Sequence, residues 1–382
     1  MNPILQDLMR TATRLTQAGR LNEVTEAIQR ALSGASAGAE ALPASGSVRP
    51  AAAATVIDGC VFEVDTPAPA ATASAEARFT SGTHTHASLT RSYKLYVPSG
   101  EPGQQRPLVV MLHGCTQDPD DFAAGTAMNE RAREQGFCVL YPAQSQDANP
   151  SRCWNWFKHN HQQRGSGEPA LIASLTLAVI KQQGIDPRRV YIAGLSAGGA
   201  MATIVAEAYP EIFAAAGVHS GLPRGAASSV PEALAVMQSG VASRGPRARA
   251  SRVGTASAEP TRPPMPVPTI VFHGDQDRTV HPRNGEHVIA DALGRVVSGE
   301  APPLRAGTPR VEQGVSSQGR RYTRSTHPGD KGDALAEHWL VHGAGHAWSG
   351  GHAAGSYTDA KGPDATREML RFFFEHPRDL KH

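Results

Sequence analysis

One serine of this sequence stands in a setting that suits nucleophilic chemistry. Ser196 lies in the run Gly194-Leu195-Ser196-Ala197-Gly198, between an apolar stretch expected to be a strand and the helical pattern of 197–208. Glycines on both sides of a serine relieve the crowding of a tight strand-to-helix turn, which is the context of a nucleophile elbow. The sequence therefore predicts that Ser196 is a catalytic nucleophile.

A serine nucleophile needs a base, and the base needs an orienting acid. In folds with a nucleophile elbow the chain order is serine, acid, histidine. Asp275 and Asp277 follow a later apolar run, and His342 and His346 follow another. Asp277 is favoured over Asp275 as the acid because it lies further into its loop. His346 is favoured over His342 as the base because the Gly-Ala-Gly segment before it can lead the loop back to the serine.

Two backbone N–H groups are expected to form an oxyanion hole. The first belongs to Ala197, directly after the nucleophile. For the second, the run Leu108–Leu112 leads into His113-Gly114-Cys115, and the amide of Cys115 is the choice. An alternative interpretation is that the thiol of Cys115 is the nucleophile. It is the weaker one, because no histidine–acid pair remains for Cys115 once Ser196 has its own.

An aromatic segment, Cys153-Trp154-Asn155-Trp156-Phe157, stands out in a chain with 5% aromatic residues. The rings either fill a hydrophobic hole or form a wall for the apolar part of a substrate, and the sequence leaves both interpretations open. Cys115 and Cys153 are expected to lie close enough for a disulfide, with their Cα atoms about 4.4–6.8 Å apart.

The elements that must position these residues alternate between strands and helices. Continuous apolar runs typical of strands buried on both faces occur at Leu108–Leu112, Phe137–Tyr141, Val190–Ala193, Ala214–Val218, Thr269–Phe272 and His338–Val341. Tyr93–Pro98 alternates like an edge strand, and 169–182 has an amphipathic helical pattern. This order predicts an α/β domain with a mostly parallel, doubly wound sheet.

The remaining segments predict a less regular periphery. Residues 1–33 are predicted to form a helical hairpin. We expect it to dock on the main domain, or on a second copy of the chain in a homo-oligomer, or else to be a loosely attached appendage. Residues 34–77 read as a low-complexity linker, and 78–377 as the catalytic domain. Within it the insertion 224–266, with a short helix at 231–238, and the stretch 295–328 are each expected to be a lid, part of a substrate site or disordered.

Composition excludes several classes of function. The chain has 382 residues and a net charge of +2, which gives no electrostatic case for nucleic acid. No apolar run approaches the ~20 residues of a membrane span. We expect no metal and no cofactor, because Cys-x-x-Cys, His-Glu-x-x-His, P-loop and Gly-x-Gly-x-x-Gly patterns are lacking. The N-terminus does not have the pattern of an export signal, so we expect a cytoplasmic protein with reduced cysteines.

Taken together, these segments resemble the poly(3-hydroxybutyrate) depolymerase-type esterases of the α/β-hydrolase superfamily. The resemblance covers roughly 78–376 and rests on the runs 91–98, 112–117, 153–157, 167–169, 189–199, 273–280 and 342–348. It implies the triad Ser196, Asp277 and His346. Gln117, in one matching segment, joins Trp154 and Trp156 as an expected substrate contact.

The resulting hypothesis is a serine esterase that acts through an acyl-enzyme. The chain ends 36 residues after His346, which favours hydroxyalkanoate oligomers or small esters over solid polymer. The alternatives are a feruloyl or acetylxylan esterase, an acyltransferase, or a non-enzymatic scaffold in which the helical hairpin acts and the hydrolase domain is vestigial.

Overall fold

The computed structural model describes residues 76–101, 103–240, 267–294, 308–329 and 332–379. The expected helical hairpin 1–33, almost all of the linker 34–77, and residues 241–266 of the insertion lie outside these described residues. Of the three parts expected from the sequence, the described residues therefore belong almost entirely to the catalytic domain.

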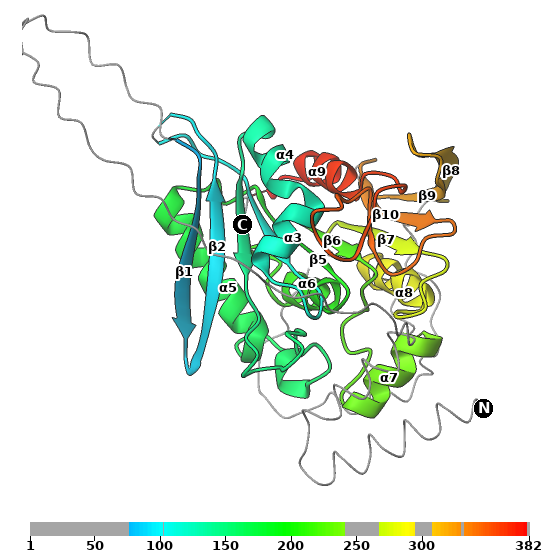
Figure 1. Ribbon diagram of the computed structural model, residues 1–382, viewed down its shortest axis with the longest axis horizontal. Helices are drawn as coiled ribbons and strands as arrows, with labels where there is room; N and C mark the ends of the chain where they lie inside the picture. Colours follow the sequence, from blue (N-terminus) through cyan, green and yellow to red (C-terminus); the bar gives the residue numbers. More distant parts are fainter. Residues whose placement is uncertain (1–75, 102, 241–266, 295–307, 330–331, 380–382) are drawn as a thin grey trace, which may run out of the picture.

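One twisted sheet of ten strands organises the described part of the chain, in the order β1-β2-β4-β3-β5-β6-β7-β10-β9-β8 (Figure 1). From β4 to β10 neighbouring strands run parallel, whereas β1, β2, β8 and β9 pair antiparallel at the two edges. The strands are β1 (Arg78–His86), β2 (Leu89–Val97), β3 (Leu108–Leu112), β4 (Cys138–Pro142), β5 (Val190–Leu195), β6 (Ala215–His219), β7 (Thr269–Gly274), β8 (Arg310–Val315), β9 (Arg321–Pro328) and β10 (Ala334–Val341).

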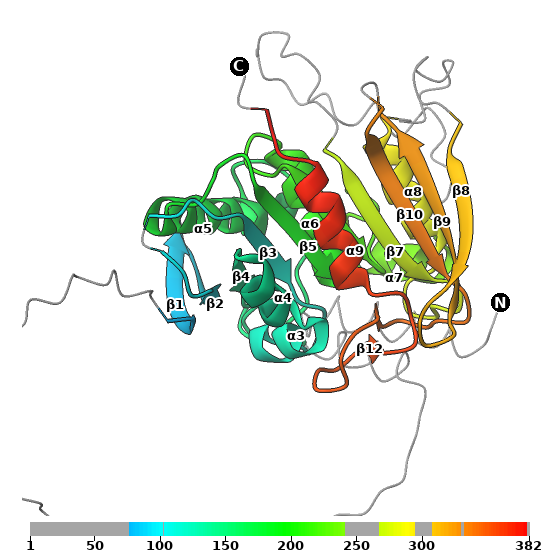
Figure 2. The same cartoon turned by 90° about the horizontal axis from the view of Figure 1, so that it is seen from above.

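Helices cover both faces of this sheet, and the alternation along β3 shows how the core is divided. Leu108, Val110 and Leu112 pack in one apolar cluster with α5 and α6, while Val109 and Met111 pack in another with α3, α4 and α9. Figure 2 shows these helices on opposite sides of the strands. The helices are α3 (Pro119–Thr126), α4 (Met128–Gln135), α5 (Gly167–Gln183), α6 (Ala197–Ala208), α7 (Val230–Ser239), α8 (Arg283–Ala292) and α9 (Ala365–Glu375), with a 3₁₀ turn η1 (His159–His161).

The expected α/β class is confirmed, and the predicted buried strands correspond to β3, β4, β5, β6, β7 and β10 within a few residues. One expectation is wrong. The stretch 295–328 was expected to be a lid, part of a substrate site or disordered, but its described part, 308–328, forms the hairpin of β8 and β9 at the sheet edge. Residues 295–307 lie outside the described residues. β8 is largely exposed and β9 is mostly half-buried, so neither strand has the continuous apolar run that is typical of the inner strands.

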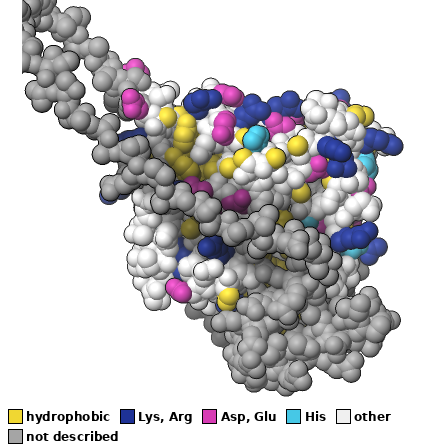
Figure 3. Space-filling view, in the orientation of Figure 1, with side chains coloured by type: hydrophobic (Ala, Val, Ile, Leu, Met, Phe, Trp, Pro, Cys, Tyr) yellow, Lys and Arg dark blue, Asp and Glu magenta, His cyan; other side chains and the backbone are white. Residues whose placement is uncertain are grey.

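Charges on the surface are mixed. On the face seen in Figure 3, basic side chains are interspersed with acidic ones along the upper edge, and more gather at the right, where Figure 1 places β8 and β9. Among the helices that the structure describes, none is long and apolar enough to span a bilayer.

Candidate active site

Ser196 occupies a strained turn between β5 and α6. Its backbone has φ 58° and ψ −118°, a conformation that non-glycine residues rarely adopt. The turn requires its glycines: a Cβ on Gly198 would lie 2.0 Å from the carbonyl oxygen of Leu112, and one on Gly194 would lie 2.4 Å from the backbone of Gly198. The structure therefore has the geometry of a nucleophile elbow, with the start of α6 pressed against the end of β3.

The predicted acid and base are hydrogen-bonded to each other. His346 Nδ1 donates to Asp277 Oδ2 at 2.7 Å, and Asp277 Oδ1 accepts the amides of Thr279 and Val280 at 2.9 and 2.8 Å. Burial opposes ionisation of Asp277, but hydrogen bonds from His273 and His346 outweigh it and hold the pKa of this carboxyl well below its usual range. With Nδ1 engaged by a carboxylate, Nε2 of His346 is left to act as a base.

The competing acid and histidine form a separate pair. Asp275 Oδ2 accepts from His342 Nδ1 at 2.9 Å, and Asp275 Oδ1 accepts the amide of Gly343. Thr323 Oγ1 lies 2.8 Å from the other ring nitrogen of His342. The structure thus pairs Asp277 with His346 as expected and assigns Asp275 to the turn after β10. Within the described residues Ser196 Oγ makes no hydrogen bond, so the complete triad stays a prediction.

His219, at the end of β6, joins the nucleophile turn to the loop of His346. Its carbonyl accepts the amide of Ser196 at 2.8 Å, and its Nε2 accepts the amide of Ser349 at 2.9 Å. The ring stacks on Phe272 and Trp348. Burial lowers the pKa of His219 to about 3, so this ring is neutral and can accept a hydrogen bond.

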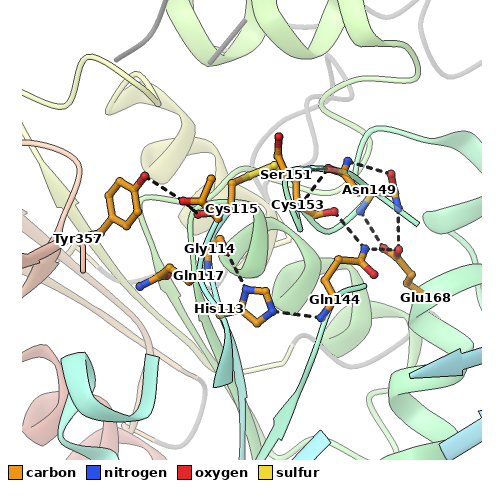
Figure 4. Close-up of a disulfide and its surroundings, with 12 residues drawn as sticks. His113, Gly114, Cys115, Gln117, Gln144, Asn149, Ser151, Cys153, Glu168 and Tyr357 are labelled. Atoms are coloured by element: carbon orange, nitrogen blue, oxygen red, sulfur yellow. Dashed lines mark hydrogen bonds between the residues drawn. A yellow bond between two sulfur atoms is a disulfide. The ribbon is translucent and has the colours of Figure 1, made fainter. Parts of the chain in front are cut away.

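The expected oxyanion turn follows β3 and is fixed on both sides of Gly114. Gln117 Oε1 accepts the amide of Gly114 at 2.9 Å, and His113 Nδ1 donates to the carbonyl of Gly114 at 2.8 Å (Figure 4). Because a trans peptide directs its C=O and N–H oppositely, this holds the Cys115 N–H away from His113. No hydrogen bond within the described chain uses the Cys115 N–H, which leaves it available to a ligand.

His113 is itself held in one protonation state. The amide of Gln144 donates to His113 Nε2 at 3.1 Å, which requires an unprotonated nitrogen there. Burial lowers the pKa of His113 to about 4, in agreement with a neutral ring. Ala197, the other expected oxyanion donor, begins α6, where the first amides have no partner inside the helix.

A disulfide ties the oxyanion turn to the aromatic segment. Cys115 and Cys153 are bonded, with their Cα atoms 4.2 Å apart, slightly nearer than expected. The expectation of reduced cysteines is not met by this pair. Cys138 is a free, buried thiol.

Behind this disulfide, Glu168 is a fully buried carboxylate on α5 (Figure 4). It accepts from Gln144 Nε2 at 2.5 Å and from the backbone and side-chain amides of Asn155 at 2.8 and 2.7 Å, and His161 lies 3.3 Å away. Burial would raise the pKa of Glu168, but hydrogen bonds from His161, Gln144 and Asn155 lower it. The carboxylate therefore orders the segment that the disulfide joins to the oxyanion turn.

The expected substrate contacts need correction. Trp154 is 0% exposed and packs with Trp156 in the core cluster of α5 and α6, so the two rings fill a hydrophobic hole. Gln117 is also buried: besides holding Gly114, it donates through Nε2 to Asp121 at 2.8 Å and to the carbonyl of Ser356 at 3.2 Å. It positions two loops, and its burial removes it from direct contact with a substrate in this structure.

The short helix expected in the insertion is confirmed as α7, but it is anchored. Ala233 and Leu234 are buried, the amide of His281 donates to the carbonyl of Met237 at 2.7 Å, and Asn284 Nδ2 donates to that of Val236 at 2.9 Å. These contacts fix the described half of the insertion to the start of α8, so α7 is part of the packed domain in this structure.

The sequence alone did not identify His219 and Gln144 as residues that position the site, and it assigned no role to Glu168. Glu168 alone carried a signal, because an acidic residue next to the apolar run of α5 is unusual for a buried helix. Within the described residues no three His, Cys, Asp or Glu side chains gather into a metal site.

The family model of Esterase PHB depolymerase matches residues 91–311, more than half of the chain. The chain belongs to this family. The match covers the oxyanion turn, the nucleophile elbow and Asp277. It is supported by 36% identity over 198 residues to a poly(3-hydroxyalkanoate) depolymerase C from Paucimonas lemoignei, covering 51% of this chain and 46% of the relative.

Other proteins that are similar to this chain carry different names. A probable acetylxylan esterase A from Aspergillus fumigatus is 30% identical over 197 residues, covering 50% of this chain and 51% of the relative. This chain spans about half the length of these two curated relatives. Among solved structures, an acetyl xylan esterase from Aspergillus awamori has the same fold, with a TM-score of 0.55, 22% identity, and coverage of 75% of this chain and 94% of that one.

Proposed function

We propose that this protein is a serine carboxylic-ester hydrolase that acts on hydroxyalkanoate oligomers or small esters. The observation that carries the proposal is the hydrogen bond of 2.7 Å between His346 and the buried Asp277, two residues that follow the strained Ser196 in the chain order of a serine hydrolase. The name of the Paucimonas lemoignei relative supports the hydroxyalkanoate class.

In the proposed mechanism Ser196 Oγ attacks the ester carbonyl while His346 Nε2 takes its proton. Asp277 stabilises the imidazolium, and the amides of Cys115 and Ala197 stabilise the oxyanion. The C–O bond to the leaving alcohol then breaks as His346 returns the proton to that alcohol, leaving an acyl-Ser196 ester. Water, deprotonated by His346, attacks this ester and releases the acid and the free serine.

A panel of esters tests the function. Wild-type protein is expected to release acid from 3-hydroxybutyrate dimers and trimers and from acetyl to octanoyl esters, and Ser196→Ala is expected to abolish release. Faster turnover of acetylated xylan fragments or feruloyl esters would favour the second candidate, which the acetylxylan esterase relatives support. Ester exchange in place of acid release, with added alcohol, would indicate an acyltransferase.

The partner proposal is that residues 1–33 join two copies of the chain. Light scattering of the full chain and of a chain lacking 1–33 tests it, because the same number of chains per particle in both proteins would contradict a contact through this segment.

A further inference from the structure

Trp154 and Trp156 are buried, whereas Tyr357 presents an aromatic ring next to the expected oxyanion turn. Tyr357 is 46% exposed, whereas Trp154 is 0% and Trp156 is 5% exposed. It directly precedes β12 (Thr358–Asp359), which pairs with β11 (Trp348–Ser349), and its carbonyl accepts the amide of Trp348 at 2.6 Å. Trp348 is two residues beyond His346, so Tyr357 is hydrogen-bonded to the loop of the proposed base.

Tyr357 also touches the oxyanion turn. Its Oη lies 3.1 Å from Thr116 Oγ1, and Thr116 directly follows Cys115. Figure 4 shows the phenol reaching toward this turn from the side opposite Glu168. The ring therefore bridges the two loops between which a bound ester carbonyl would lie.

The backbone of Tyr357 is strained and firmly held. Its φ of 52° is unusual for a bulky residue, and such strain persists only where the surroundings impose it. The preceding residue supplies that support: Asp121 accepts the amide and hydroxyl of Ser356 at 2.8 and 2.5 Å. A Cβ on Gly355 would lie 2.4 Å from the carbonyl oxygen of Asp121, so the loop is packed directly on α3.

We propose that the ring of Tyr357 is a substrate-contact residue, an aromatic wall for the apolar part of the ester next to the oxyanion turn. The inference rests on the proposed esterase function and adds a selectivity determinant to it. A fixed, half-exposed ring loses little conformational entropy when it covers an apolar group, so its contact contributes to binding with little ordering cost.

The test compares the wild type with Tyr357→Asn and Tyr357→Phe. Asparagine tolerates positive φ and removes the ring, while phenylalanine keeps the ring and removes the bond to Thr116. Two ester series are used, one with acyl chains from acetyl to hexanoyl on a fixed alcohol, and one with alcohols from methyl to phenyl on acetate. We expect kcat/KM of Tyr357→Asn to fall by roughly 10-fold more for the largest than for the smallest member of at least one series. Tyr357→Phe is expected to keep the wild-type selectivity.

Phe79→Ala is the matched control, because Phe79 is an aromatic residue of similar exposure, 37%, on the edge strand β1. It is expected to leave the selectivity unchanged. Unchanged kinetics of Tyr357→Asn, or an equal loss for every ester, would overturn the inference. If wild type hydrolyses none of the esters, the proposed function itself fails, so the two failures are distinguishable.

Discussion

The ring of His219 accepts the backbone N–H of Ser349 at 2.9 Å, and this bond requires a neutral imidazole. The same residue holds the amide of Ser196 through its carbonyl. The nucleophile turn and the His346 loop are thus joined by one buried histidine, and protonating it would remove the acceptor on which the loop depends.

The first prediction concerns stability in mild acid. Burial lowers the pKa of His113 to about 4 and of His219 and His338 to about 3. In the unfolded chain these histidines bind protons below about pH 6.5, so between pH 6.5 and 4 the unfolded state binds more protons and stability falls with acidification. Each should contribute up to about 1.4 kcal/mol per pH unit, as measured by urea unfolding at pH 7, 6, 5 and 4.

His338→Gln provides the control, because it removes one of these three imidazoles with a lowered pKa. Its unfolding free energy should vary less steeply between pH 6 and 5, by about 1 kcal/mol per pH unit. A slope equal to that of the wild type would contradict the assignment of His338 as a neutral imidazole in the folded state.

The second prediction concerns the acid of the triad. Asp277→Asn should reduce kcat by about 10⁴-fold, because an amide cannot stabilise the imidazolium of His346 or fix its tautomer. Asp275→Asn breaks the corresponding bond to His342 and should change kcat only a few-fold. Steady-state kinetics on a small chromogenic ester compares them, and equal losses in the two variants would show that the acid has been assigned wrongly.

The third prediction concerns two glycines near the site. Gly198→Ala should abolish activity and lower stability, because its Cβ would meet the Leu112 carbonyl oxygen at 2.0 Å and neither backbone can yield. Gly345→Ala should be tolerated, since nothing lies within 4 Å of its Cβ position. Thermal unfolding and ester turnover are measured together. A folded, active Gly198→Ala would disprove the close approach of β3 to α6.

The fourth prediction concerns Glu168. Glu168→Gln keeps the shape but turns one acceptor into a donor facing other donors, and it leaves the buried Arg91 and His161 without their carboxylate. We expect a loss of about 3 kcal/mol in unfolding free energy and a lower kcat, because Gln144 connects this cluster to His113. Glu312→Gln, at the ion pair with Arg324 on the outermost strand β8, should lower the unfolding free energy much less, because solvent screens an ion pair at the surface. Similar losses in both variants would rule out a special role for the buried cluster.

Residues whose signals are local could be predicted from the sequence. The apolar runs located β3, β5 and β7 because strands buried on both faces must be continuously apolar. The elbow at Ser196 followed from its glycines, and the choice of Asp277 and His346 followed from how far each lies beyond its strand. The hydrogen bond between those two side chains agrees with that choice.

Features that depend on long-range packing could not be predicted in this way. Trp154 and Gln117 have residue types that suit a binding wall, and only the packing around them shows that they are buried. Tyr357 carries no sequence signal, because its exposure and its bond to Thr116 depend on a contact between loops 241 residues apart in the chain. The strands β8 and β9 were missed because a strand that is exposed or only half-buried needs no continuous apolar run.

The pairing of the sheet has a consequence for the order in which the protein folds. The edge hairpins are local, since Leu89 pairs with His86 and Arg321 with Val315. The central pairs are distant, because Leu108 must find Val190 and Thr269 must find Ala336. Such non-local pairing makes folding slow, on the order of milliseconds to seconds. During synthesis β7 lacks its parallel partner β10 until residues 334–341 emerge, and in that interval the chain is most exposed to aggregation and to dependence on chaperones.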